Sequence, residues 1–396
     1  MSFGLDPELF VVRKGSSKAT SIHLLPKFKP ARSKSDSGNP IGVNSKTDGF
    51  ALEFVNDPSA CRDYIVPSMA QGIQDFLKQY PDYTLKAKAM MDLTVASTRG
   101  ETPEGVCNYG CVPDRSAFTL LEKTPPTDQY HNASRYIGGH IHFGVRGFPQ
   151  FSNLPNPRRA KPETDRAQSP EWRTAVAAAL TLWWDAHVAV PMVAMLGHVN
   201  DYGEAERRTY YGQAGSHRIK EYGVEYRVLS GAIMLSPFLL GWAMGAIRQA
   251  TTLSNTIRSL VEIKWDGNDE TFEAVLSADQ VHTKVGEWFE NTRLNLDGVR
   301  DIIDNHDVEG AREYVENNLN EENVYLPNLV WTMVDADKVG VGLPTNIADA
   351  WAMNQNIENH VYIGCEKLMR GGSAFPVFKN QFPAKELRQL TKSGWR

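Results

Sequence analysis

Two histidines, His140 and His142, lie two residues apart within the segment Gly139–Gly144. Residues two apart on a β-strand point to the same face, so both imidazoles would share one face while Ile141 and Phe143 point to the core. Two imidazoles on one face can begin a metal site. A hydrogen-bonded histidine pair without a ligand is the alternative.

A carboxylate and a guanidinium alternate in the same way, as Glu225 and Arg227 in the apolar run Val224–Leu229. Charged groups inside an apolar strand are costly to bury unless they are paired or bind something. Two interpretations therefore stay open, a mutual salt bridge and a ligand site, because structural ion pairs are common.

Four further carboxylates stand at or inside apolar runs near the N-terminus. Asp6 and Glu8 come directly before the run Leu9–Val12. Asp48 stands just before a second apolar run, Phe50–Val55, and Glu53 lies inside that run. Mg²⁺ takes oxygen ligands, which carboxylates on adjacent strands would supply, and a histidine in the set also suits Mn²⁺. Glu8, Glu53 and Glu225, each at or inside a predicted strand, therefore form one coherent candidate metal set with the two histidines.

A basic, glycine-rich stretch runs from Arg207 to Lys220 and includes Arg208 and Arg218. Glycines let the backbone approach a ligand, and arginines bind phosphate oxygens through two parallel hydrogen bonds. A solvated loop is the alternative. The chain has no Walker A loop, no strand-linked GxGxxG and no GxSxG elbow, so the sequence does not support a P-loop, Rossmann or α/β-hydrolase site.

Short strands followed by helices would have to position these residues. Strands are predicted at Leu9–Val12, Phe50–Val55, Tyr83–Val95, Phe118–Leu121, Ile137–Val145 and Glu221–Leu229. Helices are predicted at Ala60–Tyr80, Glu171–Leu196, Val281–Ile303, Val308–Leu319 and Ile347–Met369, and from Ile233 onward the pattern is mainly helical. Lys14–Lys46 and Gly147–Pro170 are predicted loops, the second of them basic. The fold class expected is α+β.

Composition argues against several classes of protein. Lys plus Arg is 42 and Asp plus Glu is 47, a net charge of −5, which disfavours a strongly basic nucleic-acid binder. The four cysteines form no CxxC pair, and no basic stretch followed by an apolar run opens the chain, so a cytoplasmic protein with reduced thiols is expected. The run Ala175–Gly197 is interrupted by Asp185, His187 and Pro191, which predicts a buried core helix, not a membrane span.

Five segments in this order carry a family resemblance: GLDPELF, DGFALEF, GCVPDRSAF, GGHIHFG and YGQAGSHRIKEYGVEYRVLS. Together they resemble the carboxylate–amine (COOH–NH2) ligases of bacteriophages, a branch of the glutamine synthetase and glutamate–cysteine ligase superfamily. The resemblance covers Gly4–Ser230, a little over half of the chain. It implies an antiparallel sheet curved into a funnel with helices outside. ATP would bind at one end, and the carboxylate and amine substrates would meet at the other.

The resemblance also implies roles for individual residues. The metal ligands would be Asp6, Glu8, Glu53, His140, His142 and Glu225, with His140 preferred to His142, and would hold two or more Mg²⁺ or Mn²⁺ ions. The nucleotide would be bound by Arg207, Arg208, Arg218, Lys220 and Arg227, of which Arg218 and Arg227 would also stabilise charge on the transferring phosphoryl group. Asp48 would act in catalysis, and either Asp48 or Asp6 would accept the proton of the amine.

The chemistry implied is ATP-driven amide or isopeptide formation through an acyl phosphate. Residues 1–235 would be the catalytic sheet core, with a helical insertion at 171–198, and residues 236–396 would be a helical region continuous with it. Two alternatives stay open: a metal-dependent hydrolase using the same carboxylate and histidine set, and a catalytically inactive phage structural or interaction protein. The expected partners are ATP, a carboxylate and an amine, without a membrane. Nucleic acid would enter only as a modified substrate, and a homo-oligomer stays open.

Overall fold

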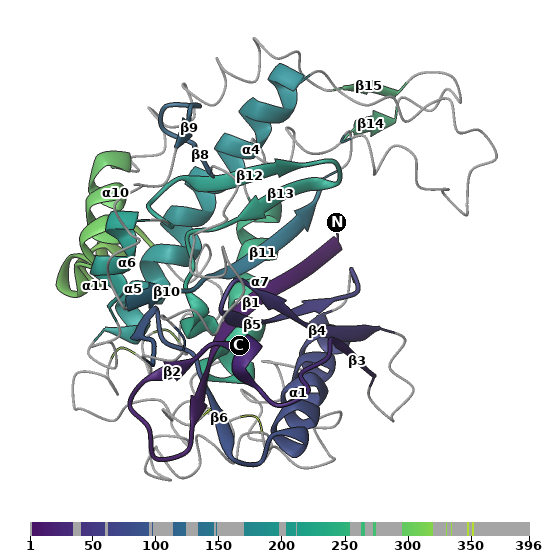
Figure 1. Cartoon of the computed structure of the whole chain (residues 1–396). Helices are drawn as coiled ribbons and strands as arrows, with labels where there is room; N and C mark the ends of the chain where they lie inside the picture. Colours follow the sequence, from purple (N-terminus) through teal and green to yellow (C-terminus); the bar gives the residue numbers. More distant parts are fainter. Residues whose placement is uncertain are drawn as a thin grey trace, which may run out of the picture.

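Figure 1 shows a computed structural model of the chain. The structure describes residues 2–34, 41–59, 62–94, 97, 114–123, 134–145, 148, 170–197, 203–210, 212–253, 263–265, 272–274 and 295–319, together with positions 330, 334, 347 and 351. Over these residues it combines a curved, mainly antiparallel sheet with packed helices.

The largest sheet has the strand order β3-β4-β5-β1-β11-β13-β12-β8-β9, and β2 and β6 also pair with β1. Its strands are β1 (Ser2–Arg13), β2 (Ala19–Thr20), β3 (Ala31–Lys34), β4 (Gly42–Asp48), β5 (Ala51–Asn56), β6 (Tyr83–Lys86), β8 (Asp114–Ser116), β9 (Glu122–Lys123), β11 (Gly139–Gly144), β12 (Ser216–Lys220) and β13 (Gly223–Tyr226). All of their pairings are antiparallel. Two small hairpin-like sheets pair β7 (Met90–Asp92) with β10 (Ser134–Tyr136), and β14 (Ile263–Trp265) with β15 (Phe272–Ala274).

Strand β1 shows why this sheet has two unlike faces. Phe3, Leu5 and Leu9 are buried, and they alternate with the less buried Asp6 and Glu8. Because residues two apart share a face, the apolar side chains all point to one side of the sheet and the carboxylates to the other. Burying the apolar set drives packing against helices and leaves the opposite face for polar chemistry.

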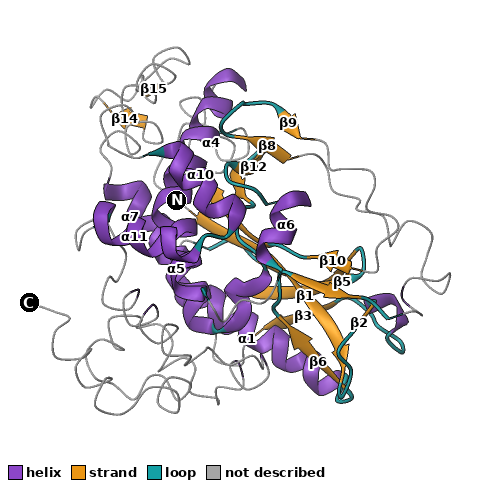
Figure 2. Ribbon diagram, turned by 90° about the vertical axis from the view of Figure 1, so that its left-hand side faces the viewer, coloured by secondary structure: helices purple, strands orange, loops and turns teal. Residues whose placement is uncertain are grey.

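Helices pack against the apolar face. They are α1 (Arg62–Gln79), α4 (Pro170–Trp184), α5 (Val190–Leu196), α6 (Glu204–Tyr210), α7 (Pro237–Leu253), α10 (Leu296–Asn305) and α11 (Val308–Asn318), with short helices η1 (Ile22–Leu24), η4 (Asp185–Ala189) and η5 (Gly231–Leu235). Helix α1 contacts β4 and β5, and α4 contacts β12 and β13. Figure 2 shows most of the helices gathered to one side of the strands. One continuous cluster of buried apolar side chains joins these layers.

The longest helical segment is built from α4, η4 and α5. Its middle part, η4, is a π-helical turn that ends just before Pro191 at the start of α5. Proline cannot donate the backbone hydrogen bond to His187 four residues earlier, and its ring crowds that carbonyl, which accounts for the widened turn. By length and composition Pro170–Leu196 would suffice to span a membrane, but its most apolar window is completely buried in the protein, as expected of a core helix.

The α+β class with a curved antiparallel sheet is confirmed, whereas several details of the prediction are wrong. The predicted loop Lys14–Lys46 contains β2, η1, β3 and part of β4. β3 is an edge strand of the sheet, so one of its sides is open to solvent and its residues can be polar. The predicted strand Phe118–Leu121 is a turn between β8 and β9, in which Leu120 has a positive φ of 59° and Leu121 is 68% exposed.

The C-terminal third was predicted to be mainly helical. Helices α7, α10 and α11 agree with that prediction, but β14 and β15 were not predicted. Most of the predicted helix Ile347–Met369 and of the predicted loop Gly147–Pro170 lies outside the described residues.

Candidate functional site

The register of four adjacent strands aligns polar residues on one face of the sheet. His142 of β11 pairs with Glu225 of β13, which pairs with Arg218 of β12. Asp6 of β1 pairs with His140 of β11. In an antiparallel sheet, directly paired residues lie side by side, so these groups form neighbouring rows across the strands. The shared face predicted for the two histidines is confirmed.

A third row extends across β4, β5 and β1. Glu53 pairs with Glu8 on one side and with Lys46 on the other. Asp48 lies two residues beyond Lys46 on β4 and is exposed. The same alternation that buries the apolar neighbours of Glu53 turns its carboxylate toward this polar face. Carboxylates from distant parts of the sequence therefore approach one another here.

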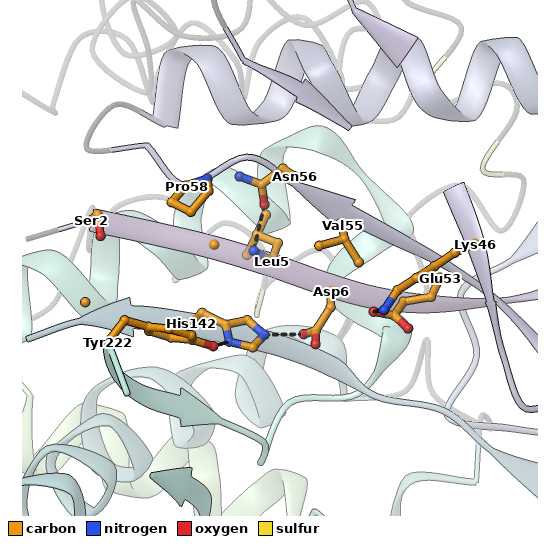
Figure 3. Close-up of a pocket in the computed structure, with 12 residues that line it drawn as sticks. Ser2, Leu5, Asp6, Lys46, Glu53, Val55, Asn56, Pro58, His142 and Tyr222 are labelled. Atoms are coloured by element: carbon orange, nitrogen blue, oxygen red, sulfur yellow. Dashed lines mark hydrogen bonds and ion pairs between the residues drawn. The ribbon is translucent and has the colours of Figure 1, made fainter. Parts of the chain in front are cut away.

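A cavity of about 480 Å³ lies above these rows, as Figure 3 shows. It is lined by Ser2, Gly4, Leu5, Asp6, Lys46, Glu53, Val55, Asn56, Pro58, His142, Gly144 and Tyr222. Its charged groups gather at one end, where Lys46 lies 3.1 Å from Glu53. A volume of this size is within the range of small-molecule binding sites. The cavity is the described feature best suited to hold a substrate.

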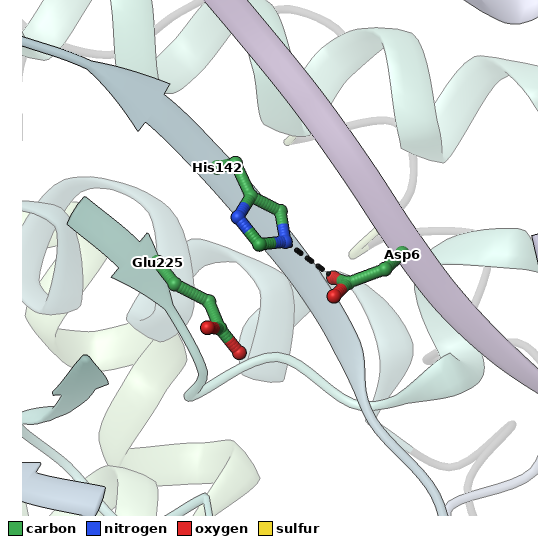
Figure 4. A group of neighbouring side chains, drawn as sticks. All are labelled: Asp6, His142 and Glu225. Atoms are coloured by element: carbon green, nitrogen blue, oxygen red, sulfur yellow. Dashed lines mark ion pairs between the residues drawn. The ribbon is translucent and has the colours of Figure 1, made fainter. Parts of the chain in front are cut away.

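Asp6, His142 and Glu225 form the one group in the described part of the chain whose ligand atoms could surround a metal ion, as Figure 4 shows. One ligand atom from each lies within 4.8 Å of the others. The His142 Nε2 atom is 2.8 Å from Asp6 Oδ1. Two carboxylates and one imidazole are a donor set suited to Mn²⁺ and acceptable to Mg²⁺. The residues present therefore fit the metal that the family resemblance implies.

His142, not His140, supplies the nitrogen of this group, which differs from the preference drawn from the sequence. Arg227 donates a hydrogen bond to His140 Nδ1 at 3.1 Å. His140 is buried, and burial together with the charge of Arg227 holds the pKa of its imidazole well below the ordinary value. His140 is thus a neutral ring that accepts a hydrogen bond from an arginine.

The electrostatics of Asp6 and His142 are those of an ion pair. Burial alone would raise the pKa of Asp6, but the adjacent His142 outweighs it and lowers that pKa. Burial would lower the pKa of His142, and Asp6 outweighs it in turn and raises that pKa. The other ring nitrogen of His142, Nδ1, is hydrogen-bonded to the Tyr222 hydroxyl. The ring orientation of His142 is therefore fixed from both sides.

Three cations surround Glu225, whose side chain is 1% exposed. Its carboxylate forms an ion pair with Arg227, lies 2.6 Å from Lys220 Nζ, and is 3.5 Å from Arg218. Although burial would raise the pKa of Glu225, Arg227 and the neighbouring cations hold it well below the ordinary value. The Glu225–Arg227 ion pair left open by the sequence is present, as one part of a larger network.

Asp114 also belongs to this network, although it was not predicted from the sequence as a site residue. Its Oδ1 is 2.7 Å from Arg227 Nε and 3.3 Å from Arg218 Nε. Asp114 belongs to the GCVPDRSAF segment, so the signal was present, but nothing in that segment showed which strand it would join. Lys46 and Tyr222 were missed for the same reason, since the register of β4 places Lys46 at the cavity and the turn before β13 places Tyr222 there.

The carboxylates at the acidic end of the site have raised pKa values, whereas the pKa of Glu225 is lowered. Burial, reinforced by the charge of Asp48, raises the pKa of Glu8 to about 8. Burial and the charge of Asp6 raise the pKa of Glu53 to about 7, which Lys46 only partly offsets. Carboxylates gathered with too few cations resist ionisation, and a divalent cation would relieve that repulsion.

None of the five predicted nucleotide-binding residues lines the cavity. Arg218, Lys220 and Arg227 lie in the network around Glu225, whereas Arg207 and Arg208 lie outside that network too. Arg207 is fully buried and donates hydrogen bonds to the carbonyl oxygens of Ile137 and Leu229, both at 2.9 Å. Arg208 bonds to the carbonyl oxygens of Gly212 and Val228 and is also buried. Both side chains hold α6 against the segment that follows β13, because buried guanidinium donors need acceptors. Nothing in the amino-acid pattern around these two arginines indicated that they would be buried.

Comparison with protein-family models, curated proteins and solved structures finds no match to this chain.

Proposed function

We propose that this chain is an ATP-dependent carboxylate–amine ligase that forms an amide or isopeptide bond through an acyl phosphate. The observation that carries the proposal is the polar face described above. There, a carboxylate-rich end at Glu8, Glu53 and Asp6 adjoins a cluster of cations centred on the buried Arg227. The order of motifs along the chain, which resembles that of phage carboxylate–amine ligases, adds to it.

The cationic cluster supports binding of a polyphosphate. Arg218, Lys220 and Arg227 contribute three positive charges, and their ion partners in the cluster are Asp114 and Glu225. Arginine binds phosphate oxygens through a planar pair of donors. Because the carboxylates already hold these side chains in place, the cations would need little reorganisation to meet an incoming anion.

The acidic end supports binding of the metal that accompanies ATP. Asp6, His142 and Glu225 would hold Mg²⁺ or Mn²⁺, and Glu8 and Glu53 stand in the adjoining rows for a second ion. Bound there, a divalent metal would neutralise charge on the phosphates. Two oxygen donors and one imidazole suit that task, and the raised pKa values of Glu8 and Glu53 are those expected where cations are too few.

The reaction proposed has two balanced steps. A carboxylate oxygen of the substrate attacks the γ-phosphorus of ATP, and ADP leaves with the electrons of the broken P–O bond. The amine nitrogen then attacks the acyl carbon, phosphate leaves, and one proton is released. Arg227 and Arg218 would stabilise charge on the transferring group. Asp48, exposed at the end of β4, is proposed as the acceptor of the amine proton, and is one of the two carboxylates, with Asp6, between which the sequence did not choose.

A metal-dependent hydrolase is the second candidate, and the group of Asp6, His142 and Glu225 favours it specifically. Such an enzyme would activate water without ATP. It gives no role to the buried cluster of Arg218, Arg227 and Asp114, which is the reason to place the ligase first.

The test is isothermal titration of the full-length protein with a non-hydrolysable ATP analogue, with Mg²⁺ and with EDTA. Binding is expected only with the metal. Arg227→Lys should weaken it by about tenfold or more, because lysine keeps the charge but loses the paired donors. Arg312→Lys is the matched control, since Arg312 is also buried and paired with a carboxylate, Glu309, but on α11.

Two results would reject the ligase. The first is an absence of analogue binding, or binding that is equally strong in EDTA. The second is equal weakening by Arg227→Lys and Arg312→Lys, which would attribute the loss to general destabilisation. Metal-dependent cleavage of amides or esters without ATP would favour the hydrolase instead.

A further inference from the structure

Asp185 is a completely buried carboxylate that the proposed reaction does not use. It is the first residue of the π-helical turn η4, inside the apolar segment that packs behind the sheet. A buried carboxylate in such surroundings needs hydrogen-bond donors to compensate for lost hydration. Turns of this kind are frequent at functional sites, which makes the partners of Asp185 informative.

Two donors satisfy Asp185, one from the turn just before β12 and the other from the end of β13. The backbone N–H of Gly215 donates to Oδ2 at 2.6 Å, and the Tyr226 hydroxyl donates to Oδ1 at 2.7 Å. Burial and the neighbouring Asp185 raise the pKa of Tyr226 well above its ordinary value, so the hydroxyl stays protonated and donates. Both contacts are short, buried and directed to one carboxyl group.

These partners lie directly behind the cationic cluster. Tyr226 stands between Glu225 and Arg227 on β13 and points to the opposite face. Gly215 immediately precedes β12, which carries Arg218. Because neighbouring residues on a strand point to opposite faces, fixing Tyr226 from behind fixes where its two charged neighbours stand in front.

Gly215 is confined to this position by its own geometry. Its φ is +76°, and a Cβ added there would approach the Phe118 ring to 2.8 Å and the Ala117 nitrogen to 3.1 Å. Its carbonyl accepts a hydrogen bond from the Ala117 N–H at 2.9 Å. The turn before β12 is thus held both by Asp185 and by the residue that follows β8, the strand of Asp114.

We infer that Asp185 is a positioning residue, which ties the turn before β12 and the end of β13 to the core helix and so sets the spacing of Arg218, Glu225 and Arg227. It touches none of these charged groups itself. The consequence for anion binding rests on the proposed function, whereas the restraint on the two strands does not.

The experiment combines two measurements on the full-length protein at pH 8. Hydrogen exchange by mass spectrometry reports on peptides covering β12 and β13, and calorimetry reports the affinity for magnesium tripolyphosphate. Asp185→Leu, which removes both contacts, should accelerate exchange in those peptides and weaken tripolyphosphate by about tenfold or more. Asp185→Asn, whose side chain can still accept from Gly215 and donate to Tyr226, should restore both to within about threefold of wild type.

Thr251→Val is the matched control. It removes the hydrogen bond that Trp184, the residue before Asp185, donates to the Thr251 hydroxyl at 3.0 Å, but keeps the Trp184 ring that packs against Tyr226 and both hydrogen bonds of Asp185. It should leave tripolyphosphate affinity within about twofold of wild type. If Asp185→Leu does not fold, Tyr226→Phe is used in place of that variant, because it removes one of the two hydrogen bonds to Asp185.

The outcomes separate the two hypotheses. If wild type binds no tripolyphosphate, the proposed function fails, and exchange in β12 and β13 alone decides the role of Asp185. Unchanged exchange there in Asp185→Leu would overturn the inference. So would equal effects of Asp185→Leu and Thr251→Val, or failure of Asp185→Asn to restore affinity that Asp185→Leu has lost.

Discussion

Replacing Glu225 and replacing Glu53 with glutamine should change stability in opposite directions, although both are buried carboxylates of one site. Glu225 is surrounded by Arg218, Lys220 and Arg227, and its side chain is 1% exposed. Glu225→Gln leaves three buried or half-buried cations with one carboxylate fewer. Breaking a buried ion pair by removing one partner costs about 3–5 kcal/mol. Because Arg218 and Arg227 keep Asp114, we expect the lower end, about 3 kcal/mol.

Glu53 has the opposite balance of charge. Burial and the carboxylate of Asp6 raise its pKa from 4.5 to about 7, so the folded state disfavours the ionised form. Its contribution to stability is full below pH 4.5 and is lost as the pH rises through about 7. A shift of this size corresponds to about 3 kcal/mol at pH 8, and the pKa of about 7 already includes the opposing effect of the half-exposed Lys46. Glu53→Gln should therefore stabilise the apo protein at pH 8.

The assay is urea denaturation of both variants and wild type at pH 8 in EDTA, so that no bound metal compensates for the charge. At pH 4.5 the advantage of Glu53→Gln should disappear, because wild-type Glu53 is then protonated in the folded state. The reasoning would be refuted if Glu225→Gln were as stable as wild type. It would equally be refuted if the two variants lost stability together.

Three further predictions concern residues outside the cavity. Burial raises the pKa of Asp185 to about 7, so the free energy of unfolding of wild type should fall between pH 4 and pH 8 relative to that of Asp185→Asn, by roughly 3–5 kcal/mol in urea titrations. Equal pH dependence of unfolding in the two proteins would contradict this. Gly215→Ala should lower the free energy of unfolding by about 1–3 kcal/mol, because alanine is strained at φ +76° and meets Phe118 and Ala117; a melting temperature equal to that of wild type would contradict it. Leu121→Ser should change stability by less than about 0.5 kcal/mol, since Leu121 is 68% exposed, and a larger loss would mean that it packs against something.

The sequence predicted which residues share one face of a strand, but it did not predict which strands lie side by side. Alternation alone placed His140 with His142, and Glu225 with Arg227, because the period of a strand is a local property. Which strand lies beside which is decided by long-range pairing, and that pairing surrounds Glu225 with cations, among them Arg218. The grouping of His142, and not His140, with Asp6 and Glu225 also depends on which strands pair.

The burial of charged side chains was the second feature that the sequence did not predict. The pair Arg207 and Arg208 resembled a phosphate-binding pair in a basic stretch, but α6 carries both into the interior, where carbonyl oxygens satisfy them. Edge strands such as β3 lack the apolar alternation that identifies a strand, so a polar loop was predicted in their place. The family resemblance and the roles that it implies stay predictions.

Trapping of the acyl phosphate tests the central proposal most directly. The full-length protein is incubated with ATP, Mg²⁺, hydroxylamine and a defined set of amino acids, peptides and other carboxylates, and products are read by mass spectrometry. Hydroxylamine replaces the amine substrate, so a ligase should convert at least one carboxylate to its hydroxamate, with ADP formed in equal amount and with loss of product in EDTA and in Arg227→Lys. Hydroxamate formed without ATP, or none from any carboxylate by protein that binds the ATP analogue, would contradict the proposed mechanism.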